Sequence, residues 1–336
     1  MVKKIVCSIL CAFILTGVSS FAQENKEFKI TGSPIITVFS DFHSGLGKHN
    51  KISGFELTRA YLGYQFNLNE KLSGRVIIDA GAASSDRFLE RQGRDIHLKN
   101  ALLNWKEDRV TISAGLVGTK QFDIQNKHWG HRYISRSFQD LYKFGPSADL
   151  GVIVSYAYSS WLNADFSLTN GEGYKNLNAD NKYSSGAGIT VMPVKGLTLR
   201  VYGDIDFGHP EMIGYETDRQ TYALFAGYKN NLFSIGAEYN YQLNNGFIKG
   251  NDYFGYSIYS QVSISPKYHI FARYDRIDSE NKQGNAWYDG GKDFIVAGLE
   301  YTPIKQLKIA PNYQYNVNET LKGPMHEIYL SAEFNW

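Results

Sequence analysis

The chain has 336 residues, and its 35 Lys and Arg against 33 Asp and Glu give a formal net charge of +2. A balance this close to neutrality argues against a general nucleic-acid binder. The composition includes 24 Tyr, 20 Phe and 32 Gly but only 8 Pro, and 15% aromatic residues is more than a soluble core usually needs.

The first 22 residues have the pattern of a secretory signal peptide. Lys3 and Lys4 precede an apolar stretch over residues 5–18, and Ser20-Phe21-Ala22 forms a small-x-small cleavage site. We therefore predict a signal peptide at 1–22 and one outer-membrane β-barrel domain at 23–336; a retained membrane anchor is the alternative. Both cysteines lie in this leader, so the mature chain is expected to lack disulfides and thiolate metal sites.

Period-two alternation dominates the rest of the chain. In LTLRVYGDIDF (residues 197–207), Leu, Leu, Val, Gly, Ile and Phe share one face, and Thr, Arg, Tyr, Asp and Asp share the other. This pattern predicts extended strands with one apolar and one polar face. About sixteen such segments are expected. They lie near 30–42, 54–68, 72–82, 96–106, 109–117, 148–158, 161–170, 183–193, 197–207, 221–229, 232–242, 253–264, 268–278, 293–302, 307–316 and 326–336.

The connections between these segments alternate between short and long. Tight turns such as KED and SPKY alternate with long polar loops such as GEGYKNLNADNK. An open sheet of this size would expose two edges, whereas a closed barrel has none. Because side chains cannot fill so wide a barrel, the apolar face is expected to point outward into lipid and the polar face onto water. We predict an all-β transmembrane barrel of about sixteen antiparallel strands; a soluble β-sandwich or solenoid is the alternative.

Aromatic residues gather near the short-turn ends of the predicted strands. Three pairs on the outward face fit a girdle at the membrane interface: Tyr64 and Phe66, Tyr156 and Tyr158, and Phe334 and Trp336. The last segment should pair with the first to close the barrel. Its terminal aromatic, Trp336, resembles the signal that outer-membrane assembly machinery recognises, although Phe is usual there.

One connection is much longer than the others and holds both aromatic and basic residues. Residues 117–147 read VGTKQFDIQNKHWGHRYISRSFQDLYKFGPS. Loops of this length are usually functional or disordered, and this one has too many aromatic anchors for disorder. We predict that this third loop folds inward, docks on the barrel wall and places its charges in the channel.

The same stretch carries a family resemblance. HWGHRYISRSFQDLYKFGPSADLGV, NADFSLTNGEGY, FELTRAYLGYQFNLNEKLSGRVIIDAG and KNALLNW resemble the phosphate-selective porin (OprO/OprP-type) family in its Bacteroidota-like form. The resemblance implies a sixteen-stranded bacterial outer-membrane porin, often trimeric, with the third loop forming the constriction. The fifth loop departs from the family pattern, because GHPEMIGYETDRQ has no lysine and carries Glu211, Glu216 and Asp218.

Nine cationic residues are candidates for the pore constriction and its selectivity. Strand parity places five on the lumenal wall, as a partial arginine ladder, and the third loop supplies four, so the set is Arg59, Arg75, Arg200, Arg273, Lys308, Lys127, Arg132, Arg136 and Lys143. Arginine binds oxyanions through two parallel hydrogen bonds. Arg132 and Arg136 are the preferred constriction charges; a salt-bridged clamp that holds the loop is an equally weighted and compatible role for them.

The other groups of polar residues in the sequence do not indicate a catalytic or metal site. Asp204 and Asp206 share a strand face, as paired acids of a hydrolase would, but acids on one face also line any porin lumen. His128 and His131 lack a supporting metal motif, so stacked or solvated histidines are favoured. We expect no cofactor, no metal and no catalysis, and a passive channel for small hydrophilic or anionic solutes. An outer-membrane barrel enzyme or adhesin without an open channel is the alternative.

Overall fold

The computed structural model describes residues 29–46, 53–82, 94–176, 182–208, 217–288, 293–318 and 323–336. The predicted leader, together with Glu211 and Glu216 of the fifth loop, lies outside these residues. Among the described residues, no helix is long and apolar enough to cross a membrane.

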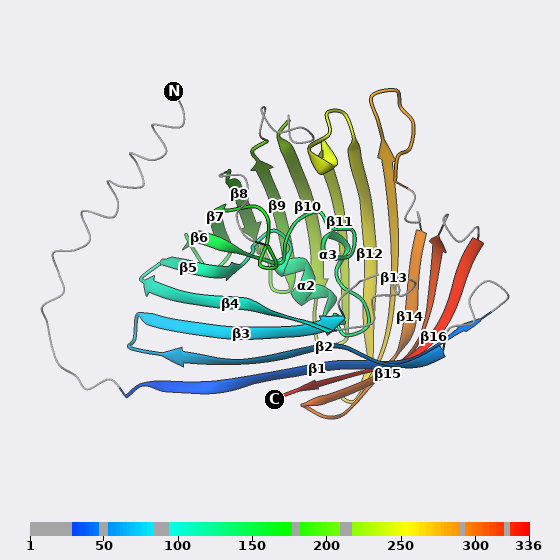
Figure 1. Cartoon of the computed structure of the whole chain (residues 1–336). Helices are drawn as coiled ribbons and strands as arrows, with labels where there is room; N and C mark the ends of the chain where they lie inside the picture. Colours follow the sequence, from blue (N-terminus) through cyan, green and yellow to red (C-terminus); the bar gives the residue numbers. More distant parts are fainter. Residues whose placement is uncertain are drawn as a thin grey trace, which may run out of the picture.

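Sixteen antiparallel strands are found in the described part of the chain, and they close into one barrel (Figure 1). They are β1 (Thr31–Leu46), β2 (Ser53–Asn67), β3 (Leu72–Ala82), β4 (Arg94–Glu107), β5 (Val110–Gly118), β6 (Ala148–Ala157), β7 (Leu162–Thr169), β8 (Ser184–Val191), β9 (Leu197–Asp206), β10 (Arg219–Lys229), β11 (Phe233–Leu243), β12 (Asp252–Ser265), β13 (Tyr268–Glu280), β14 (Asp293–Ile304), β15 (Leu307–Asn318) and β16 (Gly323–Asn335). Two short α-helices, α2 (Asp123–Trp129) and α3 (Phe138–Leu141), and a 3₁₀ turn, η2 (Asn245–Phe247), complete the described elements. Each predicted strand overlaps one of the sixteen, so the predicted fold class is confirmed.

Every strand pairs with its neighbours in sequence, and β1 pairs with β16 to close the ring. The closure includes the last residue, because the backbone N–H of Trp336 donates to the Ile36 carbonyl oxygen at 2.9 Å. Closure leaves no exposed strand edge among the described strands, so each strand has a hydrogen-bonded neighbour on both sides, as a lipid environment demands. The predicted pairing of the first and last strands is therefore confirmed.

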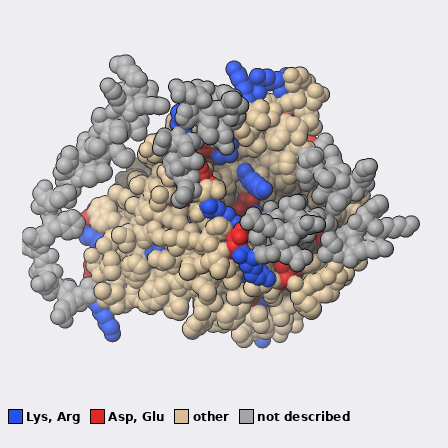
Figure 2. Space-filling model, viewed as in Figure 1, with Lys and Arg blue, Asp and Glu red and all other residues tan. Residues whose placement is uncertain are grey.

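The wall is apolar outside and polar inside. Val201 is 59% exposed and Ile235 is 46% exposed, whereas Arg200 and Glu238 on the opposite parity are 3% and 4% exposed. The charged residues visible in Figure 2 gather mainly in and around the central hollow, while the outer wall is largely uncharged. This is the reverse of a soluble protein, and it is the arrangement of a transmembrane barrel.

The short turns are built by local side-chain hydrogen bonds. Between β2 and β3, the Asn69 carboxamide oxygen accepts from the backbone N–H groups of Lys71 and Leu72 at 2.8 and 2.7 Å. Asn230 does the same between β10 and β11. Such Asn turns reverse the chain in few residues. Outward aromatics lie beside these ends, among them Tyr64, Tyr156, Phe334 and Trp336, which are exposed as the girdle prediction requires.

Four register shifts interrupt the alternation in the described strands, and two of them lie beside candidate residues. Between β1 and β2 the register shifts after Phe39, so that Arg59 and Leu57 pair with consecutive residues and Thr58 is extra. Between β3 and β4 the partner of Ile77 is Asn100 and the partner of Ile78 is Leu98, so Lys99 is extra. A bulge shifts the parity of a strand by one residue, and the second of these changes the composition of the pore wall.

Candidate functional site: a cationic cluster at the third loop

The third loop (residues 119–147) runs from β5 to β6 and folds into the barrel, carrying α2 and α3 inside the ring of strands (Figure 1). Its two ends are joined, since Thr119 donates from its hydroxyl to the Pro146 carbonyl oxygen at 2.6 Å and from its N–H to the Ser147 carbonyl oxygen at 3.2 Å. The α2 helix ends at Gly130, whose φ of 71° is the left-handed conformation that glycine adopts easily. The prediction of an inward-folded third loop is confirmed.

Aromatic side chains dock the loop on the wall formed by β12 to β14. Trp129 and Tyr133 are almost fully buried in one cluster with wall residues that include Tyr259 and Phe271. The Trp129 and Tyr259 rings meet edge to face with centroids 5.4 Å apart. The Tyr133 hydroxyl donates to the Glu300 carboxylate at 2.9 Å. Burial of large aromatic rings with their polar atoms paired explains why this loop is ordered.

His128 occupies a notch between two glycines of the wall. Gly227 of β10 and Gly236 of β11 are direct cross-strand partners. A Cβ atom at either position would come within 2.6 or 2.9 Å of the His128 ring, so only glycine leaves room. The imidazole Nε2–H donates to the Ile235 carbonyl oxygen at 2.8 Å. His131 stacks on Phe271 with centroids 4.5 Å apart. Both histidines therefore act as docking groups, as the sequence favoured.

Three of the nine predicted cations hold the loop to the wall. Arg200 binds both carboxylate oxygens of Asp165 at 2.7 and 2.9 Å and also donates to the Lys120 carbonyl oxygen at 2.9 Å. Arg273 binds both oxygens of Asp275 and donates to the carbonyl oxygen of Arg136.

Lys308 lies 3.5 Å from Glu333 and 5.6 Å above the Tyr133 ring. Arg200 and Arg273 are almost fully buried. Arg200, Arg273 and Lys308 thus support the loop. Their charges are largely neutralised by the wall carboxylates with which they form ion pairs.

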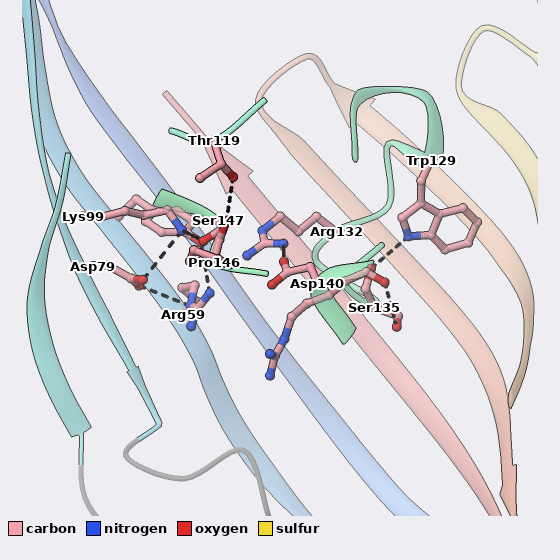
Figure 3. A network of polar contacts seen from close by, with 12 residues as sticks. Arg59, Asp79, Lys99, Thr119, Trp129, Arg132, Ser135, Asp140, Pro146 and Ser147 are labelled. Carbon is pink, nitrogen blue, oxygen red and sulfur yellow. Dashed lines mark hydrogen bonds and ion pairs between the residues drawn. The ribbon is translucent and has the colours of Figure 1, made fainter. Parts of the chain in front are cut away.

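A second group of cations lies where the base of the loop faces β2 to β4. We call Arg59, Lys99, Arg132 and Arg136 the cationic cluster (Figure 3, in which Arg59, Lys99 and Arg132 are labelled). Asp79 serves two of its members: its carboxylate lies 3.2 Å from Arg59 Nε and 4.0 Å from Lys99 Nζ. Asp140 pairs with Arg132. Four cations thus face two carboxylates, which leaves an excess of positive charge.

Arg136 is the member of the cluster without a counter-ion. Among the described residues its guanidinium has no ion pair or hydrogen bond, although its carbonyl oxygen accepts from Arg273. Burial lowers the pKa of Arg136, and the nearby Asp140 opposes that effect. Burial alone would also lower the pKa of Arg132, but Asp140 and Tyr61 outweigh it and the pKa is raised. Arginine stays protonated in either case, so the cluster carries fixed charge.

Lys99 was missed by the sequence analysis. The apolar residues Ala101, Leu103 and Trp105 define the outward parity of the KNALLNW segment, and that parity would place Lys99 outside. The bulge opposite Ile77 and Ile78 turns it inward instead. There its ammonium lies 5.1 Å from the Tyr61 ring centroid and 5.0 Å from that of Tyr174, and it donates to Ser147 Oγ at 3.2 Å. The available signal was the break in alternation between Leu98 and Ala101, three residues apart, since Ile96 and Leu98 have one parity and Ala101, Leu103 and Trp105 the other.

The other three predicted cations lie away from the cluster. Lys127 is exposed on α2 and pairs with Asp123 at 2.7 Å. Lys143 is exposed with a φ of 59°. Arg75 lines a recess of about 470 Å³ near the short-turn end, among hydroxyl and amide side chains such as Ser33 and Gln65. The structure thus divides the predicted set into a clamp, a cluster and three outlying charges.

Among the described residues, one group of side chains has ligand atoms close enough together to hold a metal ion. Asp41, His43 and Glu56 bring one ligand atom each within 4.8 Å of one another on β1 and β2. His43 Nδ1 is already 2.8 Å from Asp41, and Asp41 and Glu56 have further interactions. Asp206 of the predicted acid pair is bound by Arg219, with Nε at 2.7 Å from the carboxylate.

Comparison with known proteins supports the fold. No protein-family model matches the sequence, and no curated protein sequence matches it. Salmonella typhi OmpF, solved in complex with daunomycin, superposes with a TM-score of 0.66 at 13% identity over 91% of this chain and 97% of that one. OmpT of Vibrio cholerae, expressed in the outer membrane, gives a TM-score of 0.64 at 12% identity over 94% and 100% of the two chains.

A mutant of Rhodopseudomonas blastica porin gives a TM-score of 0.56 at 14% identity over 91% and 100%. Identities this low establish a common architecture and nothing about solute. The chain therefore has the sixteen-stranded barrel of outer-membrane proteins.

Proposed function

We propose that the protein is a bacterial outer-membrane porin: a passive channel for small hydrophilic solutes whose cationic cluster gives it a preference for anions. The observation that carries this proposal is the excess of cations at the base of the third loop, in a barrel whose charges face inward. Rings of fixed charge at a constriction raise the local concentration of the opposite ion. The channel needs no catalytic group, and solutes move down their gradients.

Two finer points rest on the family resemblance of the sequence. The first is phosphate as a favoured solute, which a cluster containing three arginines would bind through charge-assisted hydrogen bonds. The second is assembly into homotrimers after removal of a signal peptide at 1–22. Insertion by the outer-membrane assembly machinery would use the strand that ends in Trp336, whose exposed ring lies at the short-turn side.

Reversal potential in a salt gradient across a planar bilayer tests the proposal. The wild-type channel should conduct and favour chloride over potassium. The variants Lys99→Ala and Arg136→Ala should each lower the anion-to-cation permeability ratio, and their combination should lower it further. Lys127→Ala is the matched control, because it also removes a cation from the third loop but one that is exposed and paired.

Each outcome separates one part of the proposal from another. A protein that inserts but never conducts would favour the closed-barrel enzyme or adhesin. A conducting channel that prefers cations would refute the anion preference and leave the porin intact. Phosphate added to one chamber should reduce chloride current in the wild type more than in the double variant; equal reduction in both would refute phosphate binding at the cluster.

A further inference from the structure

A group of buried polar side chains lies between α3 and the wall. It is formed by Gln139 of α3, Glu238 and Asn240 of β11, and Ser257 of β12, and we call these four residues the α3 chamber. All four are at most 4% exposed. Polar residues this deeply buried normally have hydrogen-bond partners, so their pairing decides what the chamber does.

Strand register brings the four side chains together. Glu238 and Ser257 are direct cross-strand partners, so their Cβ atoms are about 5 Å apart. Asn240 is two residues along the same face, opposite Gly255. The Phe138 ring lies on Gly255, where a Cβ would come within 2.8 Å of it. This contact seats α3 over the chamber and places Gln139 beside Glu238.

Oxygen atoms from all four residues lack partners among the described residues. They are Glu238 Oε1, Asn240 Oδ1, Ser257 Oγ and Gln139 Oε1. The second polar atom of Glu238 and of Asn240 is paired, since Asn240 Nδ2 donates to Glu238 Oε2 at 3.1 Å. Gln139 Nε2 also lacks a partner, so the unpaired atoms are four oxygens and one amide nitrogen, on side chains that the strand register and α3 bring together.

Among the described residues the Glu238 carboxylate forms no ion pair, and it accepts a hydrogen bond from Asn240. Arg273 lies near it, but two of its nitrogens bind Asp275 at 2.8 and 2.5 Å and the third donates to the Arg136 carbonyl oxygen. No other cation pairs with Glu238 in the described part of the chain. A buried carboxylate without a counter-ion is strongly unfavourable, so it must either take up a proton or bind a cation.

We propose that the α3 chamber binds one small hard cation, with Na⁺ matching the single uncompensated charge. Carboxylate, carboxamide and hydroxyl oxygens are the ligands that hard cations prefer. The ion pairs the charge of Glu238 and joins Gln139 of the third loop to β11 and β12. The site therefore contributes to holding α3 on the wall, independently of which solutes the pore passes.

Chemical unfolding of the refolded full-length barrel in detergent tests this proposal. Wild-type protein should have a higher urea midpoint in NaCl than in choline chloride at the same ionic strength, because bound Na⁺ stabilises only the folded state. Glu238→Gln keeps the shape of the side chain and removes its charge, so this variant should lose the difference between the two salts. Asn240→Ala, which removes a ligand and leaves the carboxylate, should reduce the difference.

The matched control is Glu300→Gln, since Glu300 is equally buried against the third loop but already accepts from Tyr133 at 2.9 Å. It should lower stability and keep the response to sodium. A larger stabilisation by CaCl₂ that also requires Glu238 would support the site and identify its ion as divalent. Identical wild-type midpoints in all three salts, with Glu238→Gln as stable as the wild type, would overturn the proposal: Glu238 would then be protonated in a chamber that holds water.

Discussion

The third loop has two flanks that use similar residues in different ways. On the flank facing β12 to β14, Arg273 is buried with Asp275, and aromatic rings fill the remaining space. On the flank facing β2 to β4, Arg136 has no counter-ion among the described residues, and Lys99 shares one carboxylate with Arg59. Arginine alone thus indicates neither role. We propose that its pairing decides whether it holds the loop or acts on solutes, and the two flanks should respond oppositely to mutation.

The largest effect should come from the docked flank. Arg273→Ala leaves Asp275, which is fully buried, without its partner, and breaking such a pair typically costs about 3–5 kcal/mol. The third loop also loses the bond to the Arg136 carbonyl. We expect a lower urea midpoint together with larger and noisier single-channel currents. An unchanged midpoint would mean that the clamp does not hold the loop.

Acid should weaken the same flank through His131. Burial lowers the pKa of His131 to about 4, with Glu300 partly opposing the effect. An unfolded histidine binds its proton near pH 6.5, so stability falls as the pH drops from 6.5 towards 4, by about 3 kcal/mol in total. His131→Phe should abolish most of this slope while keeping the ring contact with Phe271. Urea midpoints measured between pH 7 and 4 provide the test; parallel profiles for the two proteins would contradict it.

The glycine notch should give an intermediate effect. Gly236→Val places methyl groups where the His128 ring lies and should cost about 1–3 kcal/mol by overpacking. Gly203→Val, at a glycine of β9 whose added Cβ would meet no atom closer than 3.5 Å, is the matched control. Conductance of the Gly236 variant should rise because α2 is displaced. A destabilisation equal to that of the control would show that the notch is unimportant for docking.

The smallest effect on stability should come from Arg136. Its side chain has no ion pair in the described part of the chain and is only half-buried, so Arg136→Ala should change the unfolding free energy by about 0.5 kcal/mol or less. Its effect on anion selectivity should nevertheless exceed that of Arg273→Met, which removes a charge already neutralised. Reversal potentials and urea midpoints measured on both variants complete the comparison. If the selectivity changes of the two variants follow their stability changes, and Arg136→Ala alters selectivity no more than Arg273→Met, the division between flanks would be refuted.

Much of the architecture was predictable because it is local. Alternating polarity sets which face of each strand meets lipid, and the alternation of short and long connections sets the antiparallel order. The segment at 197–207 illustrates this, since Leu199 and Val201 are exposed and Arg200 is buried as its pattern requires. The aromatic content of residues 117–147 likewise predicted a folded third loop.

The pairing of the cations was decided only by the tertiary structure. Arg200 and Asp165 are 35 residues apart in sequence, and the bond from Arg273 to Arg136 spans 137 residues. Such contacts depend on the curvature of the closed wall and on the path of the loop, which no local pattern encodes. Lys99 also could not be placed from local pattern, because one extra residue in β4 reverses the face of the wall that alternation assigns to it. The sequence by itself determined an inside-out barrel with a basic inward loop; the three-dimensional arrangement decided which positive charges remain uncompensated, since neutralisation is a matter of distance between groups far apart in the chain.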